Sequence, residues 1–263
     1  MNENEIETEL CRAWDILEVD AEEALRITDA LPPEVAERHL VRAHAKLDLL
    51  LIDEGEAELD KAALAFGEEQ DHVRFVRGRL RFLQWRIEEA RQEFEVISHE
   101  SFYPEVFVFR AMCAEVEGDL ERSDELYARA IAVSNEGYDP PRFTPDEFKS
   151  CVGTAADALP PLFREAFERV VVVIDSMPTK AIVDFENTGH PPDILGLFVG
   201  APLSEGEPLP GELPPTIFLF QRNLERFAAS KEELIEEIQV TLYHELGHAL
   251  GFDEDDVEHM GLA

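Results

Sequence analysis

The sequence predicts an α-helical repeat that stacks into a solenoid, followed by a small α+β domain. Small and apolar residues recur at a constant step of 33 through residues 5–136, a spacing typical of stacked helix pairs. Residues 144–263 instead alternate helical periodicity with short β-branched runs and end in a long helix. Residues 137–143 are rich in turn formers, so we expect a linker there.

Composition limits the classes of partner. The formal net charge is −35, from 58 acidic and 23 basic residues, and no basic stripe offsets it. We therefore expect neither nucleic-acid binding nor attachment to an anionic membrane. The amino terminus has no signal-peptide pattern, and no apolar run is long enough to span a bilayer. Cys11, Cys113 and Cys151 lack metal-ligand spacing and are interpreted as reduced core thiols, which favours a cytoplasmic protein.

The repeat is carried by three series of small or apolar residues at the step of 33. They are Ala45, Gly78 and Ala111; Ala24, Ala57, Ala90 and Ser123; and Leu31, Leu64, Ile97 and Ala130. Phe94 and Tyr127 follow the second series by four positions, where Thr28 and Lys61 stand in the earlier copies. Small positions at this spacing allow paired helices to approach closely.

This pattern resembles the tetratricopeptide repeat, in about four copies. The resemblance implies helix-turn-helix units and a concave surface for a peptide or protein partner. No cluster of potential metal ligands stands out in this half, and its histidines are expected at the surface or the edge of the core: His39, His44, His72 and His99.

The second half begins with a clear helix start. Thr144 is the expected N-cap, Pro145 occupies the first helical position, and Glu147 completes a capping box. A further helix is expected at about 161–168. Strands are expected at three apolar runs: 169–175, 194–199 and 216–221.

The last helix is expected from Lys231 to Leu250, with Ser230 as its N-cap. Its core-facing residues recur every four positions: Ile238, Leu242, Leu246 and Leu250. His244 and His248 are also four apart, so they share a different face, one turn from each other. Two neutral imidazoles so placed can chelate a tetrahedral zinc ion, and the adjacent Glu245 is the expected general base.

The spacing His-Glu-x-x-His-x-x-Gly-x-x-ligand is the metzincin arrangement. Gly251 supplies the glycine at which the chain can turn back sharply toward the metal. The third ligand then falls on Glu254, where metzincins have His or Asp. A carboxylate suits zinc, and Asp253 and Asp256 remain alternatives for this position.

The tail from Thr241 to Gly261, with the segments 195–204 and 214–222, resembles the small bacterial zincin-like metallopeptidase family. The resemblance covers about 144–263. It implies a zinc cofactor bound by His244 and His248, with Glu245 as catalytic base. The strand near Leu195–Gly200 is a candidate for the cleft edge that pairs with an extended substrate.

Together these features predict a zinc-dependent peptidase that acts on a peptide or protein substrate and uses its repeats for docking. Two alternatives are kept. The chain is a catalytically silent zinc-binding adaptor that works through its repeats, or it is a latent peptidase that the repeats gate.

Overall fold

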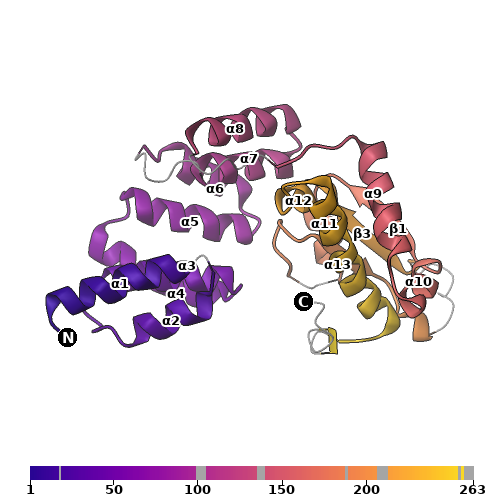
Figure 1. Ribbon diagram of the computed structural model, residues 1–263. Helices are drawn as coiled ribbons and strands as arrows, with labels where there is room; N and C mark the ends of the chain where they lie inside the picture. Colours follow the sequence, from indigo (N-terminus) through magenta and orange to yellow (C-terminus); the bar gives the residue numbers. More distant parts are fainter. Residues whose placement is uncertain are drawn as a thin grey trace. The chain divides into compact units, whose positions relative to one another are not determined.

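The computed structural model describes residues 1–17, 19–98, 105–134, 140–186, 189–205, 213–253 and 256–257. The chain divides into two compact units, Met1–Asn135 and Glu136–Ala263 (Figure 1). Each unit contains its own clusters of buried apolar side chains. No described helix combines the length and the apolar content that a bilayer crossing requires.

All the secondary-structure elements among the described residues of the first unit are helices. Its helices are α1 Glu3–Leu17, α2 Ala21–Asp29, α3 Glu37–Asp48, α4 Ile52–Phe66, α5 Asp71–Leu83, α6 Ile87–Glu95, α7 Glu105–Glu117 and α8 Leu120–Val133. Each helix packs against the next, and the first helices of successive pairs, α1, α3, α5 and α7, also contact one another. The prediction of a helical first half is confirmed.

The turns inside the helix pairs share one backbone feature. Leu50, Trp85 and Gly118 have φ values of 55°, 61° and 82°, in the left-handed region. Such a residue reverses the chain at a helix end and lets the following N–H reach a carbonyl of the last turn. The Leu51 N–H, for example, donates to the Lys46 oxygen at 2.8 Å. The same turn therefore recurs three times, with glycine at only one of its left-handed positions.

The 33-residue step correctly predicts buried residues in α3, α5 and α7, which are the first helices of their pairs. It fails in α4, the second helix of the second pair. Ala57 and Leu64 are exposed, the latter by 90%, so this part of the prediction was wrong. Helices α2, α4 and α6 begin at residues 21, 52 and 87, so the steps are 31 and 35 residues. The buried residues of α4 are therefore found two positions earlier, beginning with Gly55.

Close contact between paired helices explains this register. A Cβ atom on Gly55 would lie 2.9 Å from Cδ2 of Leu47, and one on Gly78 would lie 2.6 Å from the ring of Phe94. Both distances are shorter than real carbon contacts, so a side chain at either glycine would push two helices apart. The face of α4 that carries Gly55 is thus the one that can pack on α3.

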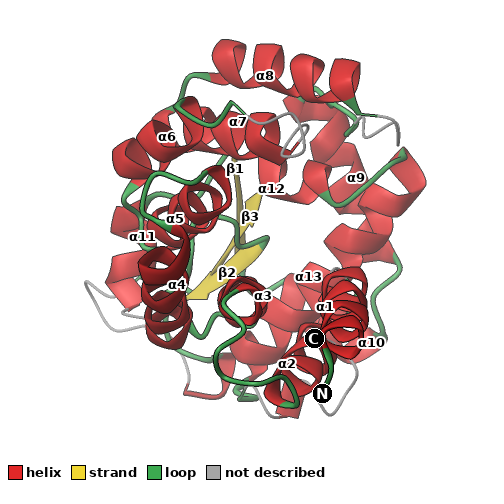
Figure 2. Cartoon of the chain, turned by 90° about the vertical axis from the view of Figure 1, so that its left-hand side faces the viewer, coloured by secondary structure: helices red, strands yellow, loops and turns green. Residues whose placement is uncertain are grey.

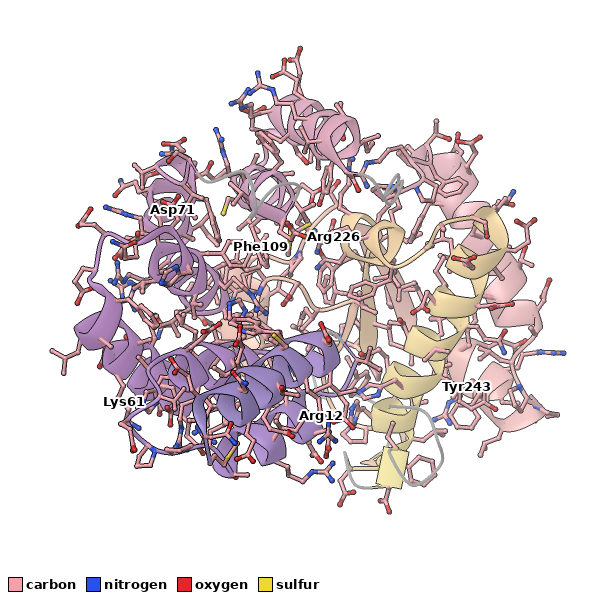
Figure 3. The ribbon with its side chains drawn as sticks, turned by 60° about the vertical axis from the view of Figure 1, so that its left-hand side comes forward. Arg12, Lys61, Asp71, Phe109, Arg226 and Tyr243 are labelled. Carbon is pink, nitrogen blue, oxygen red and sulfur yellow. The ribbon has the colours of Figure 1, made fainter. Side chains whose placement is uncertain are left out.

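Lys61, which the repeat pattern placed in a shared slot, extends from α4 and donates to the Oε1 atom of Glu58 at 3.1 Å (Figure 3). The Glu58 carboxylate is buried and also pairs with Nδ1 of His39 at 2.6 Å. Burial by itself raises the pKa of Glu58, but the hydrogen bonds from His39 and Lys61 and the charge of Arg42 lower it to about 2. This network ties the α3 and α4 helices together.

The second unit is mixed, as predicted. Its elements are α9 Pro145–Asp157, α10 Pro161–Phe167, β1 Val171–Asp175, α11 Lys180–Glu186, β2 Gly196–Val199, η2 Leu203–Glu205, β3 Thr216–Phe220, α12 Gln221–Arg226 and α13 Lys231–Leu250. The Thr144 hydroxyl accepts from the Glu147 N–H and the Glu147 carboxylate accepts from the Thr144 N–H, which is the expected capping box. The sequence did not predict α11 or α12.

The three strands form one sheet in the order β1-β3-β2 (Figure 2). Strand β1 runs parallel to β3, with Val173 opposite Phe218, and β2 runs antiparallel to it, with Phe198 opposite Ile217. Helix α13 contacts β2, β3, α9 and α10. Four of its leucine and isoleucine residues are buried in a core that these elements share, Leu234, Ile238, Leu242 and Leu246, and Leu250 is partly buried against that core. The predicted apolar face of this helix is thereby confirmed up to Leu246.

The three cysteines are free thiols, but their environments differ. Cys113 and Cys151 are buried, whereas Cys11 is exposed on α1, so the prediction of a core position was wrong for Cys11. Burial raises the pKa of Cys113 to about 12. Cys113 is therefore protonated and unreactive at neutral pH.

Candidate functional site

The site is built on α13, whose two ends are defined by local hydrogen bonds. The Ser230 hydroxyl accepts from the Glu233 N–H at 3.1 Å, and Gly251 ends the helix in the left-handed conformation with φ 94°. The Phe252 N–H then bonds back to the Gly247 carbonyl at 3.0 Å. The chain after the helix is thus folded back over its last turn, which is the path the sequence predicted for Gly251.

The two histidines of α13 converge. Their Nε2 atoms lie 3.1 Å apart, with ring centroids separated by 4.8 Å and ring planes at 77°. Two nitrogen ligands on one tetrahedral zinc ion, each at about 2.0–2.1 Å, would be separated by roughly 3.3 Å. His244 and His248 therefore present two nitrogen donors at the separation that one metal ion requires.

A backbone carbonyl orients the second histidine. Nδ1 of His248 lies 3.2 Å from the carbonyl oxygen of Phe252, a group that can only accept a hydrogen bond. This contact places the imidazole proton on Nδ1 and leaves the lone pair of Nε2 for a metal or for the other histidine. Metal-binding histidines in proteins use such carbonyl contacts to set tautomer and ring angle. The donor set thus fits a metal ion at the Nε2 atoms.

Glu245 lies on the same helix but faces the sheet. Its side chain is buried, with 7% of the residue exposed, and its Oε2 atom accepts a hydrogen bond of 2.7 Å from the backbone N–H of Phe198. The contact joins α13 to β2 across 47 residues of sequence. This hydrogen bond restricts the orientation of the carboxylate, which follows His244 directly in the sequence.

Strand β2 can approach this carboxylate because Gly196 has no side chain. A Cβ atom there would lie 2.6 Å from Cγ2 of Thr241 and 3.1 Å from Cγ of Glu245. Asn223 on α12 also anchors the chain that leads into β2, since its buried amide donates to the carbonyl of Ile194 at 2.6 Å. The strand that the sequence proposed as a cleft edge thus lies at the end of the sheet and against the candidate base.

The expected third ligand, Glu254, lies outside the described residues. Asp253 and Asp256 are described and exposed, and each carboxylate accepts from the backbone N–H of the other residue, at 2.9 and 3.4 Å. Among the described residues, no group of three or more His, Cys, Asp or Glu side chains is arranged to hold a metal. The structure does not bring either aspartate to the histidine pair.

The comparison with known families agrees with this geometry. Residues 167–262 match the family described as zincin-like metallopeptidase. The matched segment runs from the end of α10 through the whole of α13, so it contains both histidines, Glu245 and β2. The helical first unit lies outside it. No curated protein matches the chain.

Two contributors to the site were not found from the sequence. The first is the backbone N–H of Phe198, and the second is the Asn223 amide that anchors the approach to β2. A backbone donor leaves no signature in the sequence because every residue except proline carries one. The sequence does contain one indication of this contact, which is Gly196 inside an apolar run. A glycine within a strand marks a position that another element approaches closely.

Proposed function

We propose that the chain is a zinc-dependent peptidase whose zinc ligands are His244, His248 and Glu254. The observation that carries this proposal is the convergence of the two Nε2 atoms, together with the carbonyl contact that orients His248. The family match over residues 167–262 supports the same class of chemistry. Glu254 is retained as third ligand because its spacing after Gly251 suits a chain that turns back at that glycine.

The chain's own groups account for the proton transfers. When bound, zinc would polarise the scissile carbonyl and make the attacking water more acidic. The Glu245 carboxylate takes the proton of that water and passes it to the nitrogen of the departing amine. The Phe198 N–H, which donates to Oε2, holds the carboxylate in place for this role. Burial against β2 limits the access of competing water.

The helical unit would serve as a docking module. We propose that its helix pairs are tetratricopeptide-like repeats over 5–136, followed by a linker at 137–143 and the peptidase domain at 144–263. The contacts between successive first helices support a stacked arrangement. Free thiols at Cys11, Cys113 and Cys151 fit a reducing compartment such as the cytoplasm.

The test compares Glu245→Gln with wild type in the full chain, by metal analysis and by hydrolysis of an unfolded protein substrate. Glutamine keeps the shape of the side chain but cannot accept a proton, so we expect zinc to remain and hydrolysis to fall by about 10²–10⁴-fold. Glu236→Gln is the matched control, because Glu236 is an exposed acid on the same helix. Hydrolysis that survives in Glu245→Gln would refute the assigned base.

The same measurements separate the alternatives. A wild-type chain that binds zinc without any hydrolysis, both in full length and as residues 136–263, would favour the silent adaptor. Hydrolysis by the fragment but not by the full chain would favour a latent enzyme. The first result would remove the peptidase assignment while leaving the metal site in place.

A further inference from the structure

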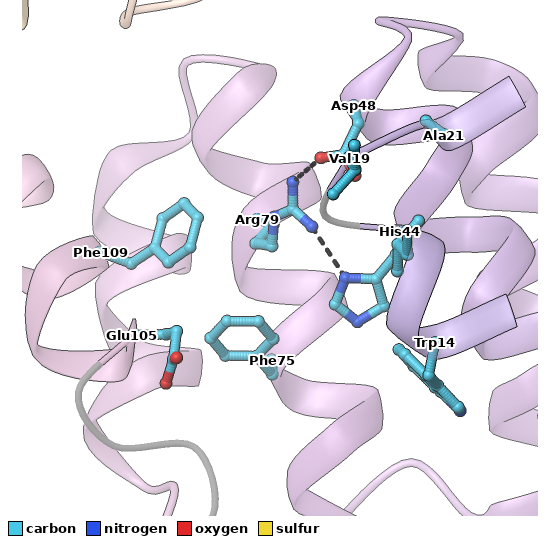
Figure 4. A pocket seen from close by; sticks show the side chains of 10 residues that line it. Trp14, Val19, Ala21, His44, Asp48, Phe75, Arg79, Glu105 and Phe109 are labelled. Carbon is cyan, nitrogen blue, oxygen red and sulfur yellow. Dashed lines mark hydrogen bonds and ion pairs between the residues drawn. The ribbon is translucent and has the colours of Figure 1, made fainter. Parts of the chain in front are cut away.

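Two histidines of the first unit line one pocket among apolar and aromatic side chains. The pocket has a volume of about 450 Å³, and its polar lining residues are His44 and Glu37 on α3 and His72 on α5. It is called the histidine pocket below, and its other walls are Trp14, Leu40, Phe66 and Phe75. A neighbouring pocket of about 630 Å³ shares three of these residues and is drawn in Figure 4. Apolar walls that carry a few polar groups are typical of ligand sites of this size.

The protonation of His44 is set by its neighbours. Arg79 forms an ion pair with Asp48 and donates to Nδ1 of His44 at 2.8 Å, as the dashed lines in Figure 4 show. Because arginine can only donate a hydrogen bond, Nδ1 is the acceptor and the proton of the neutral imidazole lies on Nε2. Burial, and then the charge of Arg79, lower the pKa of His44 well below its usual value, which keeps the ring neutral.

The Nε2–H group of His44 is therefore a fixed donor. Figure 4 shows this nitrogen on the edge of the ring that faces away from Arg79, toward Phe75 and Trp14. The centroid of the His44 ring lies 5.5 Å from that of Trp14 and 5.9 Å from that of Phe75. Among the described residues, the contact with Arg79 is the one hydrogen bond of this imidazole. The Nε2–H group is thus free to donate to a ligand.

His72 supplies a second imidazole nitrogen. Its Nε2 atom is buried and has no hydrogen-bond partner in the described part of the chain. The ring packs edge-on against Phe66, with centroids 4.9 Å apart. Burial lowers the pKa of His72 in spite of the charges of Glu37 and Asp71, so the ring is neutral at pH 7. Buried polar atoms in folded proteins are nearly always hydrogen-bonded, so this nitrogen gains a partner when a polar group enters the pocket.

Hydrogen-bond capacity selects the polar group of the ligand. An ammonium or a guanidinium can only donate, so neither pairs with the fixed donor of His44. A carboxylate can accept there, but it meets the charge of Glu37, which the indole N–H of Trp14 keeps in the lining at 3.0 Å. A hydroxyl both donates and accepts, so it pairs with His44, and it pairs with Nε2 of His72 in either tautomer.

We propose that the histidine pocket binds a free, uncharged aromatic molecule that carries one hydroxyl group for each histidine. One hydroxyl accepts from the Nε2–H of His44, the other pairs with Nε2 of His72, and the ring system between them packs on the apolar walls. A tyrosine side chain brings a single hydroxyl and would leave one histidine without a partner. The site belongs wholly to the first unit, so the proposal goes beyond the peptidase function and does not rest on it.

The test measures binding to the full chain by isothermal titration calorimetry. The probe is a dihydroxynaphthalene with one hydroxyl at each end of the ring system. Its comparators are the dimethyl ether, which cannot donate, the dicarboxylate of the same ring system, and a blocked pentapeptide with one tyrosine among glycines. The protein carries Glu245→Gln, so that hydrolysis of the peptide adds no heat. We expect saturable binding of the diol at one site and binding at least about tenfold weaker for every comparator.

Three variants separate recognition from stability. His44→Phe and His72→Phe each keep a ring but remove the nitrogen that faces the ligand, so each should weaken binding of the diol about fivefold or more. His72→Phe should not lower the thermal midpoint, because the nitrogen that it removes has no partner in the described chain. His39→Gln is the matched control, since His39 pairs with Glu58 at 2.6 Å and lies outside the lining. It should lower the midpoint and change the affinity by less than about twofold.

Four outcomes would overturn the proposal. They are no saturable binding of the diol by a folded chain, equal affinity for the diol and its dimethyl ether, equal affinity for the diol and the tyrosine peptide, and a loss of affinity in His39→Gln as large as in His72→Phe. Thermal unfolding of every variant, followed by tryptophan fluorescence, checks that the first unit is folded. Zinc content and hydrolysis do not enter these measurements, so the result does not depend on the peptidase.

Discussion

Replacing Gly196 by alanine tests whether β2 and α13 are in the contact that the site requires. The added Cβ would lie 2.6 Å from Cγ2 of Thr241, whereas two carbon atoms prefer about 3.5–4.0 Å. The strand and the helix must therefore separate by about 1 Å. Such overpacking costs about 1–3 kcal/mol, from which the lower flexibility of alanine recovers at most about 1 kcal/mol. The second unit should lose about 1–2 kcal/mol of stability.

The same separation should affect the site. The new Cβ would also lie 3.1 Å from Cγ of Glu245, whose carboxylate accepts from the Phe198 N–H. A displacement of about 1 Å in a catalytic group costs about 10²-fold in rate. Hydrolysis by Gly196→Ala should accordingly fall by about that factor while zinc binding by His244 and His248 is retained.

The assay can follow the two units separately. Both tryptophans, Trp14 and Trp85, belong to the first unit, so urea unfolding followed by tryptophan fluorescence should be unchanged. Far-ultraviolet circular dichroism should show an earlier transition for the second unit. Gly153→Ala is the matched control, because a Cβ at this exposed helical position would meet no atom within 4 Å other than its chain neighbours and its own helix backbone. This change should stabilise α9 by up to about 1 kcal/mol.

A compensating variant makes the test specific. Thr241→Ser removes the Cγ2 atom that the new Cβ would meet, so it should restore most of the stability lost in Gly196→Ala. If Gly196→Ala is as stable as wild type, or if Thr241→Ser recovers nothing, the contact between β2 and α13 is not as described.

Three further predictions concern the first unit. The pKa of Glu58 is lowered from 4.5 to about 2, so its ionised carboxylate adds about 3 kcal/mol to the free energy of unfolding above pH 4.5. This contribution is lost as the pH falls toward 2, and Glu58→Gln should remove this part of the acid dependence in urea titrations. A thiol reagent at pH 8 should label Cys11 readily and Cys113 only on unfolding, since Cys113 is buried and its pKa is raised to about 12; fast labelling of Cys113 in the native chain would contradict its placement. Gly78→Ala should cost about 1–3 kcal/mol in tryptophan-monitored unfolding because its Cβ would meet the Phe94 ring, and an unchanged midpoint would argue against that packing.

Sequence periodicity was least reliable where packing decides the register. The step of 33 located the buried faces of α3, α5 and α7, but it placed Ala57 and Leu64 on the wrong face of α4. Loop and helix lengths differ between pairs, and the face that packs is selected by steric fit, as at Gly55 against Leu47. A constant step of 33 residues cannot predict a helix start that comes after 31 residues in one pair and after 35 in the next.

What the sequence by itself determined is local. The ends of α13, the capping box at Thr144, the left-handed exit at Gly251 and the shared face of His244 and His248 depend on residues within about one or two helical turns. What only the tertiary structure decided is which distant groups meet these elements. The Phe198 N–H reaches Glu245 across 47 residues, and α1, α3, α5 and α7 each bring one aromatic ring to the lining of a single pocket. Such contacts depend on how the whole chain packs, because their geometry is set by sheet order and helix register and not by neighbours in sequence.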